Sequence, residues 1–154
     1  MYDNLIRDLD ALLDAFDHSV TTLANAAAFL FQNIERINWL GFYLYDGDGK
    51  KLYLGPFAGK PACTNIEIGK GVCGTAALKK EIIIVDDVDK FPGHIACDPE
   101  SRSEIVLPII LSDGSLFGVL DVDSIELARF GESEKNNFEK VAEIVAKKIS
   151  ALST

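Results

Sequence analysis

The stretch that decides the fold spans residues 104–123 and reads EIVLPIILSDGSLFGVLDVD. Two strongly apolar runs, at 104–111 and 115–123, flank Ser112-Asp113-Gly114, a combination typical of a tight turn. The pattern therefore predicts a β-hairpin. Pro108 lies inside the first strand and lacks a backbone N–H, so we expect an edge or a bulge at that point.

The segments on either side extend this pattern. A second hairpin is predicted from strands at 38–45 and 51–56 around Asp46-Gly47-Asp48-Gly49, and the β-branched run at 82–85 predicts a buried strand. Apolar residues at helical spacing predict a first helix from Leu5 to Phe16 and further helices at about 19–34, 72–80 and from 131–133 to 152. Residues 55–70 are expected to be mostly loop, and 86–102 a long polar loop. Terminal helices with hairpins between them predict an α+β fold, a mostly antiparallel sheet with the N- and C-terminal helices packed on it, in a single domain over 1–154.

Composition excludes several function classes. The chain has 154 residues, 48% of them hydrophobic, enough for one packed core. Fifteen Lys and Arg against 24 Asp and Glu give a net charge of −9, which disfavours nucleic acid and anionic membranes as partners. The acidic start Met1-Tyr2-Asp3 does not resemble a secretory signal, so we expect a cytoplasmic protein.

The three cysteines, Cys63, Cys73 and Cys97, are an odd number for a static disulfide framework. They can be buried, ligate a metal or perform thiol chemistry. A zinc site with His94 is disfavoured because the paired, closely spaced ligands of structural zinc are missing, so neither a metal nor another cofactor is expected. Cys97 lies in the polar loop, where its thiol is accessible, and His94 could aid its ionisation.

Gly69-Lys70-Gly71-Val72-Cys73-Gly74 matches the dinucleotide-binding pattern G-x-G-x-x-G, but its context does not fit. That pattern needs a buried strand before it and a full crossover helix after it. The glycines more simply let the backbone pass close to a pocket. Cys73 would then lie at a helix start, where the dipole lowers a thiol pKa, or it would be a small buried core residue.

Asp121 and Asp123 are two residues apart in a strand and therefore point to the same face. Two close carboxylates resist joint ionisation, so one pKa should rise, and Glu104 on the partner strand could join them. The alternative is a strand end in solvent. Trp39 and Tyr43 share one face of their strand with Gly41, so they either line a pocket or form ordinary core beneath a terminal helix.

These motifs together resemble a known family, the free methionine-(R)-sulfoxide reductases, which are single GAF domains. The resemblance runs from about residue 36 to 152 and includes all three cysteines. It is carried by the segments Asn38-Trp39-Leu40-Gly41-Phe42-Tyr43, Leu54-Gly55-Pro56-Phe57, Pro61-Ala62-Cys63, Ile68-Gly69-Lys70-Gly71-Val72-Cys73-Gly74, Gly93-His94-Ile95-Ala96-Cys97-Asp98, Ser103-Glu104-Ile105-Val106-Leu107-Pro108 and Gly118-Val119-Leu120-Asp121-Val122-Asp123-Ser124.

The resemblance implies that a thiolate reduces free L-methionine-(R)-sulfoxide, leaving a sulfenic acid that a second thiol converts to a disulfide. It implies Cys97 as the nucleophile and Cys63 as the resolving cysteine, with Cys73 a second candidate for either role. A positioned acid must protonate the sulfoxide oxygen. The carboxylates implied for this step and for binding the substrate ammonium are Glu104, Asp121 and Asp123. Trp39 and Tyr43 would line the space for the S-methyl group, thioredoxin would recycle the enzyme, and the family habit is a homodimer.

Two other functions remain open from the sequence. A GAF domain can bind a small ligand as a sensor without converting it. The same cysteines could also form a non-catalytic redox switch. Turnover of the free sulfoxide would distinguish the enzyme from both.

Overall fold

The computed structural model describes residues 2–14 and 17–152, and its centre is a six-stranded sheet in the order β3-β2-β1-β6-β5-β4. All neighbouring strands are antiparallel. In chain order the strands are β1 (Trp39–Asp46), β2 (Lys51–Gly59), β3 (Asn65–Glu67), β4 (Ile83–Val85), β5 (Ser103–Ile110) and β6 (Leu116–Ser124). The predicted hairpin is β5–β6, and β6 pairs with β1 at the centre of the sheet.

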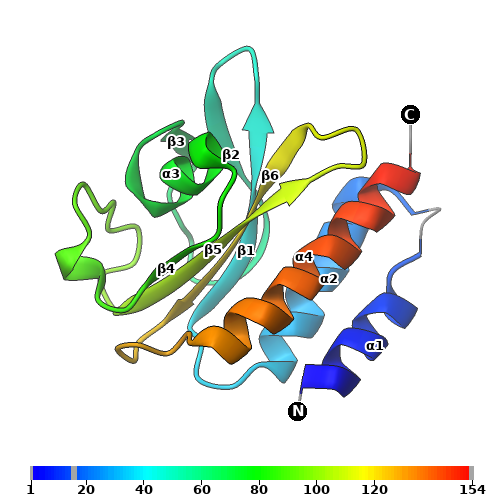
Figure 1. The fold of residues 1–154 in the computed structure, drawn as a ribbon, viewed down its shortest axis with the longest axis horizontal. Helices are drawn as coiled ribbons and strands as arrows, with labels where there is room; N and C mark the ends of the chain where they lie inside the picture. The colour runs from blue at the N-terminus through cyan, green and yellow to red at the C-terminus, as the bar shows by residue number, and fades with distance from the viewer. Residues whose placement is uncertain (1, 15–16, 153–154) are drawn as a thin grey trace.

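The helix α1 (Tyr2–Leu12) packs from outside on α2 (Ser19–Asn33) and α4 (Glu132–Ala151), and the latter two cover one face of the sheet (Figure 1). Their apolar sides pack on alternate residues of the central strands, such as Phe42 and Val122. The predicted fold class is therefore confirmed. Phe16, the last apolar residue of the predicted first helix, lies outside the described residues. No helix in the described ranges has both the length and the apolar character that a bilayer span requires.

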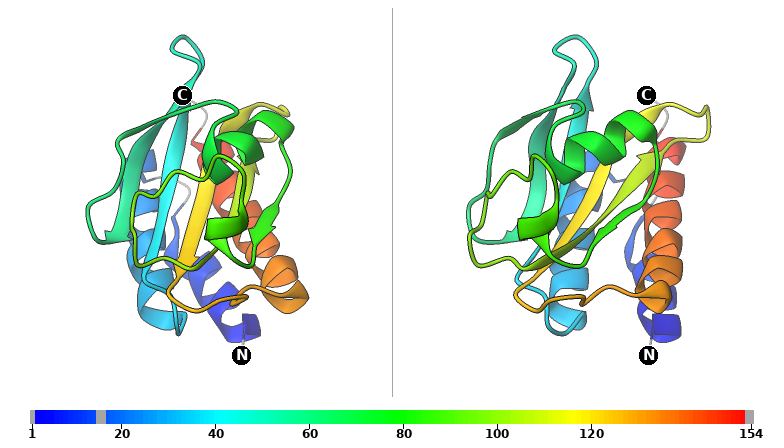
Figure 2. Two further views of the ribbon diagram at one scale, coloured as in Figure 1. Left: turned by 90° about the vertical axis from the view of Figure 1, so that its left-hand side faces the viewer. Right: turned by 60° about the vertical axis from the view of Figure 1, so that its left-hand side comes forward.

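The opposite face is covered by α3 (Gly71–Lys79), the 3₁₀ turn η1 (Val88–Lys90) and their loops (Figure 2). Because β3 and β4 lie at opposite edges of the sheet, the chain between them has to cross this face, and α3 lies on that crossing. A second, smaller core forms here, in which Val72 of α3 packs with Trp39 and Tyr43. The two faces of β1 thus belong to two different cores, as the alternation in its sequence predicts.

The edges of the sheet differ from the prediction. Residues 55–70 contain more strand than expected, because β2 continues to Gly59 and β3 pairs with its start. The run at 82–85 is an edge strand rather than a buried one: Ile83 and Ile84 are half-buried, since β4 has a neighbour on one side only. β4 pairs with β5 only from residue 104 to 106, so Pro108 has no strand partner on the β4 side of β5. A register shift between β5 and β6 follows at Ile109, so Pro108 lies at an unpaired edge next to an irregularity, as predicted.

Candidate active site

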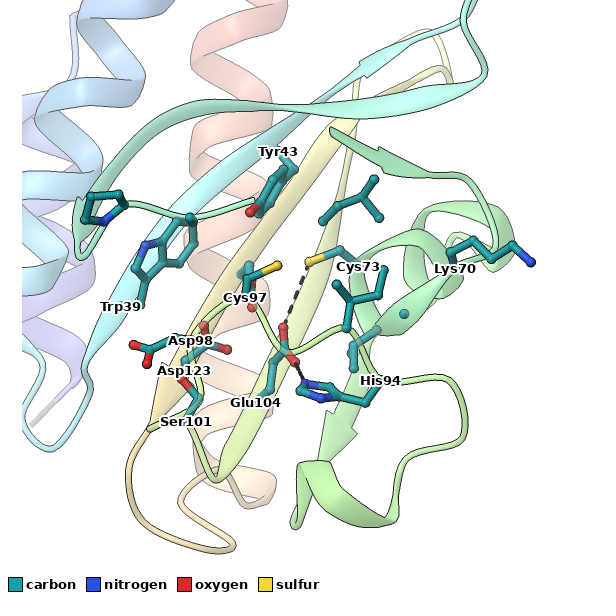
Figure 3. A pocket seen from close by; sticks show the side chains of 17 residues that line it. Trp39, Tyr43, Lys70, Cys73, His94, Cys97, Asp98, Ser101, Glu104 and Asp123 are labelled. Carbon is teal, nitrogen blue, oxygen red and sulfur yellow. Dashed lines mark hydrogen bonds and ion pairs between the residues drawn. The ribbon is translucent and has the colours of Figure 1, made fainter. Parts of the chain in front are cut away.

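A pocket lies on the α3 side of the sheet, between the central strands, α3 and the loop that precedes β5 (Figure 3). It holds about 560 Å³ of empty space, its open mouth included. The predicted site residues that line it are Trp39, Tyr43, Cys73, Cys97, Glu104, Asp121 and Asp123. Cys63, the remaining predicted residue, is bonded to one of them.

The strand register brings the three carboxyl groups together. Asp123 of β6 lies directly opposite Glu104 of β5, and Asp121 follows on the same face. Asp121 and Glu104 are only 5% and 7% exposed, which rules out a strand end in solvent. Leu120 and Val122, between and beside the two aspartates, point into the helix-side core instead.

The environment favours protonated aspartates. Burial raises the pKa of Asp121 well above its usual value, and the charges of Asp123 and Glu104 raise it further. Loss of hydration likewise raises the pKa of Asp123, with the Glu104 charge adding to the effect. The predicted rise of a carboxyl pKa is therefore found at both aspartates, and the pocket can hold a proton donor near neutral pH.

An aromatic wall faces these acids. The Trp39 ring stacks on Tyr43 and on Phe57, with centroid distances of 5.9 and 5.4 Å. Gly41 leaves room for this stack, because a Cβ there would overlap Phe57 and lie 2.7 Å from the Trp39 ring. Trp39 and Tyr43 are thus part of the smaller core and line the pocket, and they do not lie beneath a terminal helix.

The indole N–H of Trp39 and the hydroxyl of Tyr43 form hydrogen bonds with the backbone of the segment that contains Cys63. Trp39 Nε1 donates to the Lys60 carbonyl oxygen at 3.0 Å, and the Tyr43 hydroxyl donates to the Cys63 carbonyl oxygen at 2.9 Å. Burial, together with the charge of Asp121, raises the pKa of Tyr43, so its hydroxyl remains a neutral donor. The aromatic wall therefore positions a cysteine as well as shaping the pocket.

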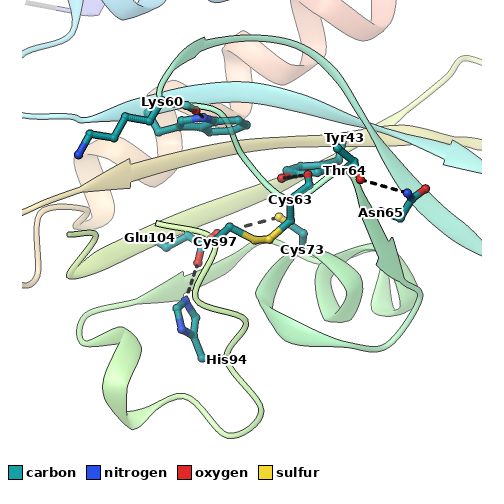
Figure 4. Close-up of a disulfide and its surroundings, with 10 residues drawn as sticks. Tyr43, Lys60, Cys63, Thr64, Asn65, Cys73, His94, Cys97 and Glu104 are labelled. Carbon is teal, nitrogen blue, oxygen red and sulfur yellow. Dashed lines mark hydrogen bonds and ion pairs between the residues drawn. A yellow bond between two sulfur atoms is a disulfide. The ribbon is translucent and has the colours of Figure 1, made fainter. Parts of the chain in front are cut away.

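A disulfide joins Cys63 and Cys97 (Figure 4). Cys63 lies in the loop between β2 and β3, and Cys97 in the loop between η1 and β5; their Cα atoms are 5.4 Å apart. Both residues are half-buried. An exposed ion pair at 2.8 Å, Lys60 with Glu100, links the same two loops, although such surface pairs contribute little stability. Cys97 lines the pocket, so the disulfide lies at its edge.

Cys73 behaves differently from the dipole-based expectation. It is a free, buried thiol in the first turn of α3, with its Sγ 4.0 Å from Glu104 Oε2. Burial raises the pKa of Cys73 well above its usual value, and the charges of Asp121 and Glu104 raise it further. Loss of water and three nearby acids outweigh the positive helix end, so the thiol stays neutral.

His94 faces the acids as well. Its Nε2 is 3.7 Å from Glu104 Oε1, and Figure 3 shows Glu104 between His94 and Cys73. The polar partner of His94 is therefore Glu104. This contact orients the carboxyl group from the side of the loop.

The comparisons with known proteins agree with this geometry. The GAF domain family matches residues 8–149. The free methionine-R-sulfoxide reductase of Saccharomyces cerevisiae is 44% identical over 150 residues, covering 94% of this chain and 83% of the yeast protein. The enzyme of the same name from Escherichia coli is 44% identical over 140 residues, covering 91% of this chain and 83% of that protein.

This chain belongs to the free methionine-R-sulfoxide reductase family of GAF domains. The free methionine-R-sulfoxide reductase of Neisseria meningitidis, solved in complex with its substrate, superimposes with a TM-score of 0.91 at 42% identity. That comparison covers 99% of this chain and 90% of the Neisseria chain. The family resemblance stated from the sequence motifs is thereby confirmed.

This member of the GAF family also contains positioning residues that the sequence patterns did not reveal. Asn38, just before β1, donates from Nδ2 to Asp98 Oδ2 and to Ser101 Oγ, both at 3.0 Å. Asp98 directly follows Cys97, so Asn38 fixes the turn that carries that cysteine. Asn38 and Asp98 are 60 residues apart in the sequence, so the contact forms only when the folded chain brings the start of β1 beside the loop.

The glycine-rich segment does not build a dinucleotide site. β3 before it is a three-residue edge strand antiparallel to β2, and α3 after it has nine residues. Gly71 begins α3 with a φ of +62°, a conformation that favours glycine, and a Cβ there would lie 3.0 Å from Ile95. The segment thus lets the backbone pass close to the pocket loop, as the simpler interpretation predicts.

Proposed function

We propose that this protein reduces free L-methionine-(R)-sulfoxide to L-methionine. The single observation that carries the proposal is the Cys63–Cys97 disulfide at the pocket that also holds the acids of β5 and β6. A thiol pair and a proton donor are the two requirements of sulfoxide reduction. The names of the yeast and Escherichia coli relatives support the same substrate.

The reaction balances with the groups of this chain and one external dithiol. The Cys97 thiolate attacks the sulfur of the protonated sulfoxide and forms a sulfur–sulfur bond, while the S–O bond breaks and the oxygen leaves as water. Water then attacks Cys97 Sγ and loses a proton, methionine leaves with the electron pair of the sulfur–sulfur bond, and Cys97 remains as a sulfenic acid. The Cys63 thiol then attacks that sulfenic acid, forming the disulfide and releasing water. An external dithiol reduces the disulfide and is itself oxidised.

The acids have two roles in this proposal. The sulfoxide oxygen must be protonated before it can leave, and the protonated members of the Glu104, Asp121 and Asp123 cluster are suited to supply that proton. Carboxyl oxygens of the same cluster also accept hydrogen bonds from the substrate ammonium. Asp121 Oδ1 is buried and has no hydrogen-bond partner in the described structure, so a ligand ammonium would satisfy it.

The aromatic wall is suited to the other end of the substrate. Trp39 and Tyr43 present an apolar surface on β1, the strand next to the aspartates of β6, and an S-methyl group can pack on it. Cys73 is a weaker candidate for nucleophile or resolving thiol, because its sulfur is buried and neutral. We therefore assign the nucleophile to Cys97 and resolution to Cys63.

Recycling requires a protein dithiol that reaches the half-buried disulfide. We propose thioredoxin for this role, acting in the cytoplasm, where such reductants are kept reduced. We further propose that the protein acts as a homodimer. Size-exclusion chromatography with light scattering tests the dimer. Replacing thioredoxin with glutathione in the assay tests the reductant, because turnover should then be lost.

The decisive assay follows NADPH consumption through thioredoxin reductase and thioredoxin with free L-methionine-(R)-sulfoxide as the substrate. Sustained consumption supports the enzyme. Saturable binding without consumption would instead support a ligand sensor, and oxidation of the protein without turnover would support a redox switch. A sulfoxide inside a peptide serves as the substrate control.

Two cysteine variants separate the assigned roles. Cys97→Ser should abolish reduction, because no thiolate attacks the sulfoxide. Cys63→Ser should release about one methionine per active site and then stop, since its sulfenic acid has no resolving partner. Multiple turnover at the wild-type rate in Cys97→Ser would contradict the assignment. A peptide map of the oxidised wild-type protein checks the bridge independently.

A further inference from the structure

One cluster in the pocket combines two of the acids with a cysteine to which the proposed reduction assigns no step. Cys73, Glu104 and Asp121 each offer one ligand atom, and these three atoms lie within 4.8 Å of one another. All three residues are buried. Thiolate sulfur and carboxylate oxygen are both ligands of zinc-class cations, and this set uses neither of the cysteines in the disulfide.

A second observation indicates that the cluster is open to a ligand. Asp121 is 5% exposed and lines the pocket, yet its Oδ1 has no hydrogen-bond partner in the described part of the chain. A buried carboxylate oxygen of this kind is costly unless something binds it. The described structure contains no ion pair of Asp121 with a lysine or arginine.

The surroundings resemble the outer shell of a cation site. His94 Nε2 lies 3.7 Å from Glu104 Oε1 and can orient that carboxyl group from outside the cluster. Lys70 lines the same pocket, but Figure 3 shows its side chain extending away from Cys73 and Glu104. No lysine or arginine side chain therefore competes for the cluster among the residues drawn there.

We propose that Cys73, Glu104 and Asp121 form a binding site for a thiophilic divalent cation of the zinc class. Cys73 binds as a thiolate and its proton is released to solvent. Ligand atoms around tetrahedral zinc are roughly 3.6 Å apart, so the 4.0 Å between Cys73 Sγ and Glu104 Oε2 needs only a small side-chain rotation. The fourth position faces the pocket and is available to water.

This site does not depend on the proposed reductase activity, but it overlaps with it. A cation on Asp121 and Glu104 removes the groups proposed to bind the substrate ammonium and to donate the proton. Zinc and free methionine sulfoxide should therefore compete for the pocket. The cation thus acts as an inhibitor, and it has no place in the catalytic steps.

Cobalt provides the direct test, because a thiolate–Co²⁺ bond gives a near-ultraviolet charge-transfer band. The experiment uses oxidised protein without substrate or reductant, in which Cys73 is the single free thiol of the three cysteines. We expect a charge-transfer band that saturates at one equivalent of Co²⁺ and disappears when Zn²⁺ is added. Because no sulfoxide is present, failure of the reductase assay would leave this result unaffected.

Matched variants locate the site. Cys73→Ser should lose the band, and Asp121→Asn should weaken Co²⁺ binding by at least about tenfold. Glu100→Gln, which changes an exposed acid of the neighbouring loop, is the control and should bind as the wild type does. Circular dichroism verifies that each variant is folded. A missing band at millimolar Co²⁺, or unchanged affinity in Asp121→Asn, would overturn the proposal.

Discussion

Replacing Asp121 with asparagine should make the folded protein more stable at neutral pH while it weakens the pocket. The pKa of Asp121 is raised well above its usual value, first by burial and then by the charges of Asp123 and Glu104. In the unfolded chain the same carboxyl group titrates near its ordinary pKa of about 3.9. The folded state therefore retains a proton that the unfolded state has already lost.

The sign and size of the effect follow from this difference. Above about pH 4 the unfolded state binds fewer protons, so the free energy of unfolding falls as the pH rises toward the folded-state pKa of Asp121. Each unit of that raised pKa costs about 1.4 kcal/mol. Asparagine carries no proton to lose, so at about pH 7 Asp121→Asn should have the higher free energy of unfolding, and each kcal/mol gained should raise Tm by roughly 2–4 °C in a domain of this size.

Urea unfolding of oxidised wild type and Asp121→Asn from about pH 4 to about pH 8 measures the effect. The two free energies should converge near the acid end and separate as the pH rises. Asp113→Asn is the control, because Asp113 is exposed and hydrogen bonds from Ser115 lower its pKa, which reverses the sign. Parallel curves for wild type and Asp121→Asn would refute a carboxyl group held protonated by its burial.

Two further changes test how the pocket is built. Gly41→Ala places a methyl group 2.7 Å from the Trp39 ring and against Phe57. It should destabilise the protein by about 1–3 kcal/mol and raise KM. Fluorescence emission from Trp39, the one tryptophan of the sequence, reports the displaced ring. Asn38→Ala removes both hydrogen bonds to the loop after Cys97, at a cost of about 1–3 kcal/mol, and should slow disulfide formation in stopped-flow single turnover. An unchanged Trp39 spectrum, or unchanged disulfide kinetics, would contradict the respective interpretation.

The regular elements were predictable because their patterns are local. The two apolar runs in residues 104–123 and the turn between them define β5 and β6, and the two-residue period of a strand explains why Asp121 and Asp123 point together into the pocket. Helical spacing gave α2 and α4 to within about two residues. The two-residue period put Trp39 and Tyr43 on the opposite face of β1 from Phe42, but it left open which of the two faces the helices cover.

Features that depend on distant partners were not predictable from these patterns. The end of β2 shows little strand character because Gly55 and Pro56 interrupt it at a register shift, yet residues 57–59 pair with β1 again, since the neighbouring strand supplies their hydrogen bonds. The local helix start suggested a reactive Cys73, whereas acids from two distant strands keep that thiol neutral. Sequence patterns also left the pairing of the cysteines open, and only the family resemblance indicated Cys63 and Cys97.

The distribution of groups between strands and loops suits a reaction in which acids stay fixed and sulfurs move. Glu104, Asp121 and Asp123 lie on paired strands, where a shift would break the sheet. Cys63 and Cys97 lie on two loops, which can separate after reduction without disturbing either core. A nucleophilic thiolate close to three acids would be suppressed, as Cys73 is. Placing the redox pair on loops at the edge of the cluster lets one pocket combine a proton donor with an ionisable thiol.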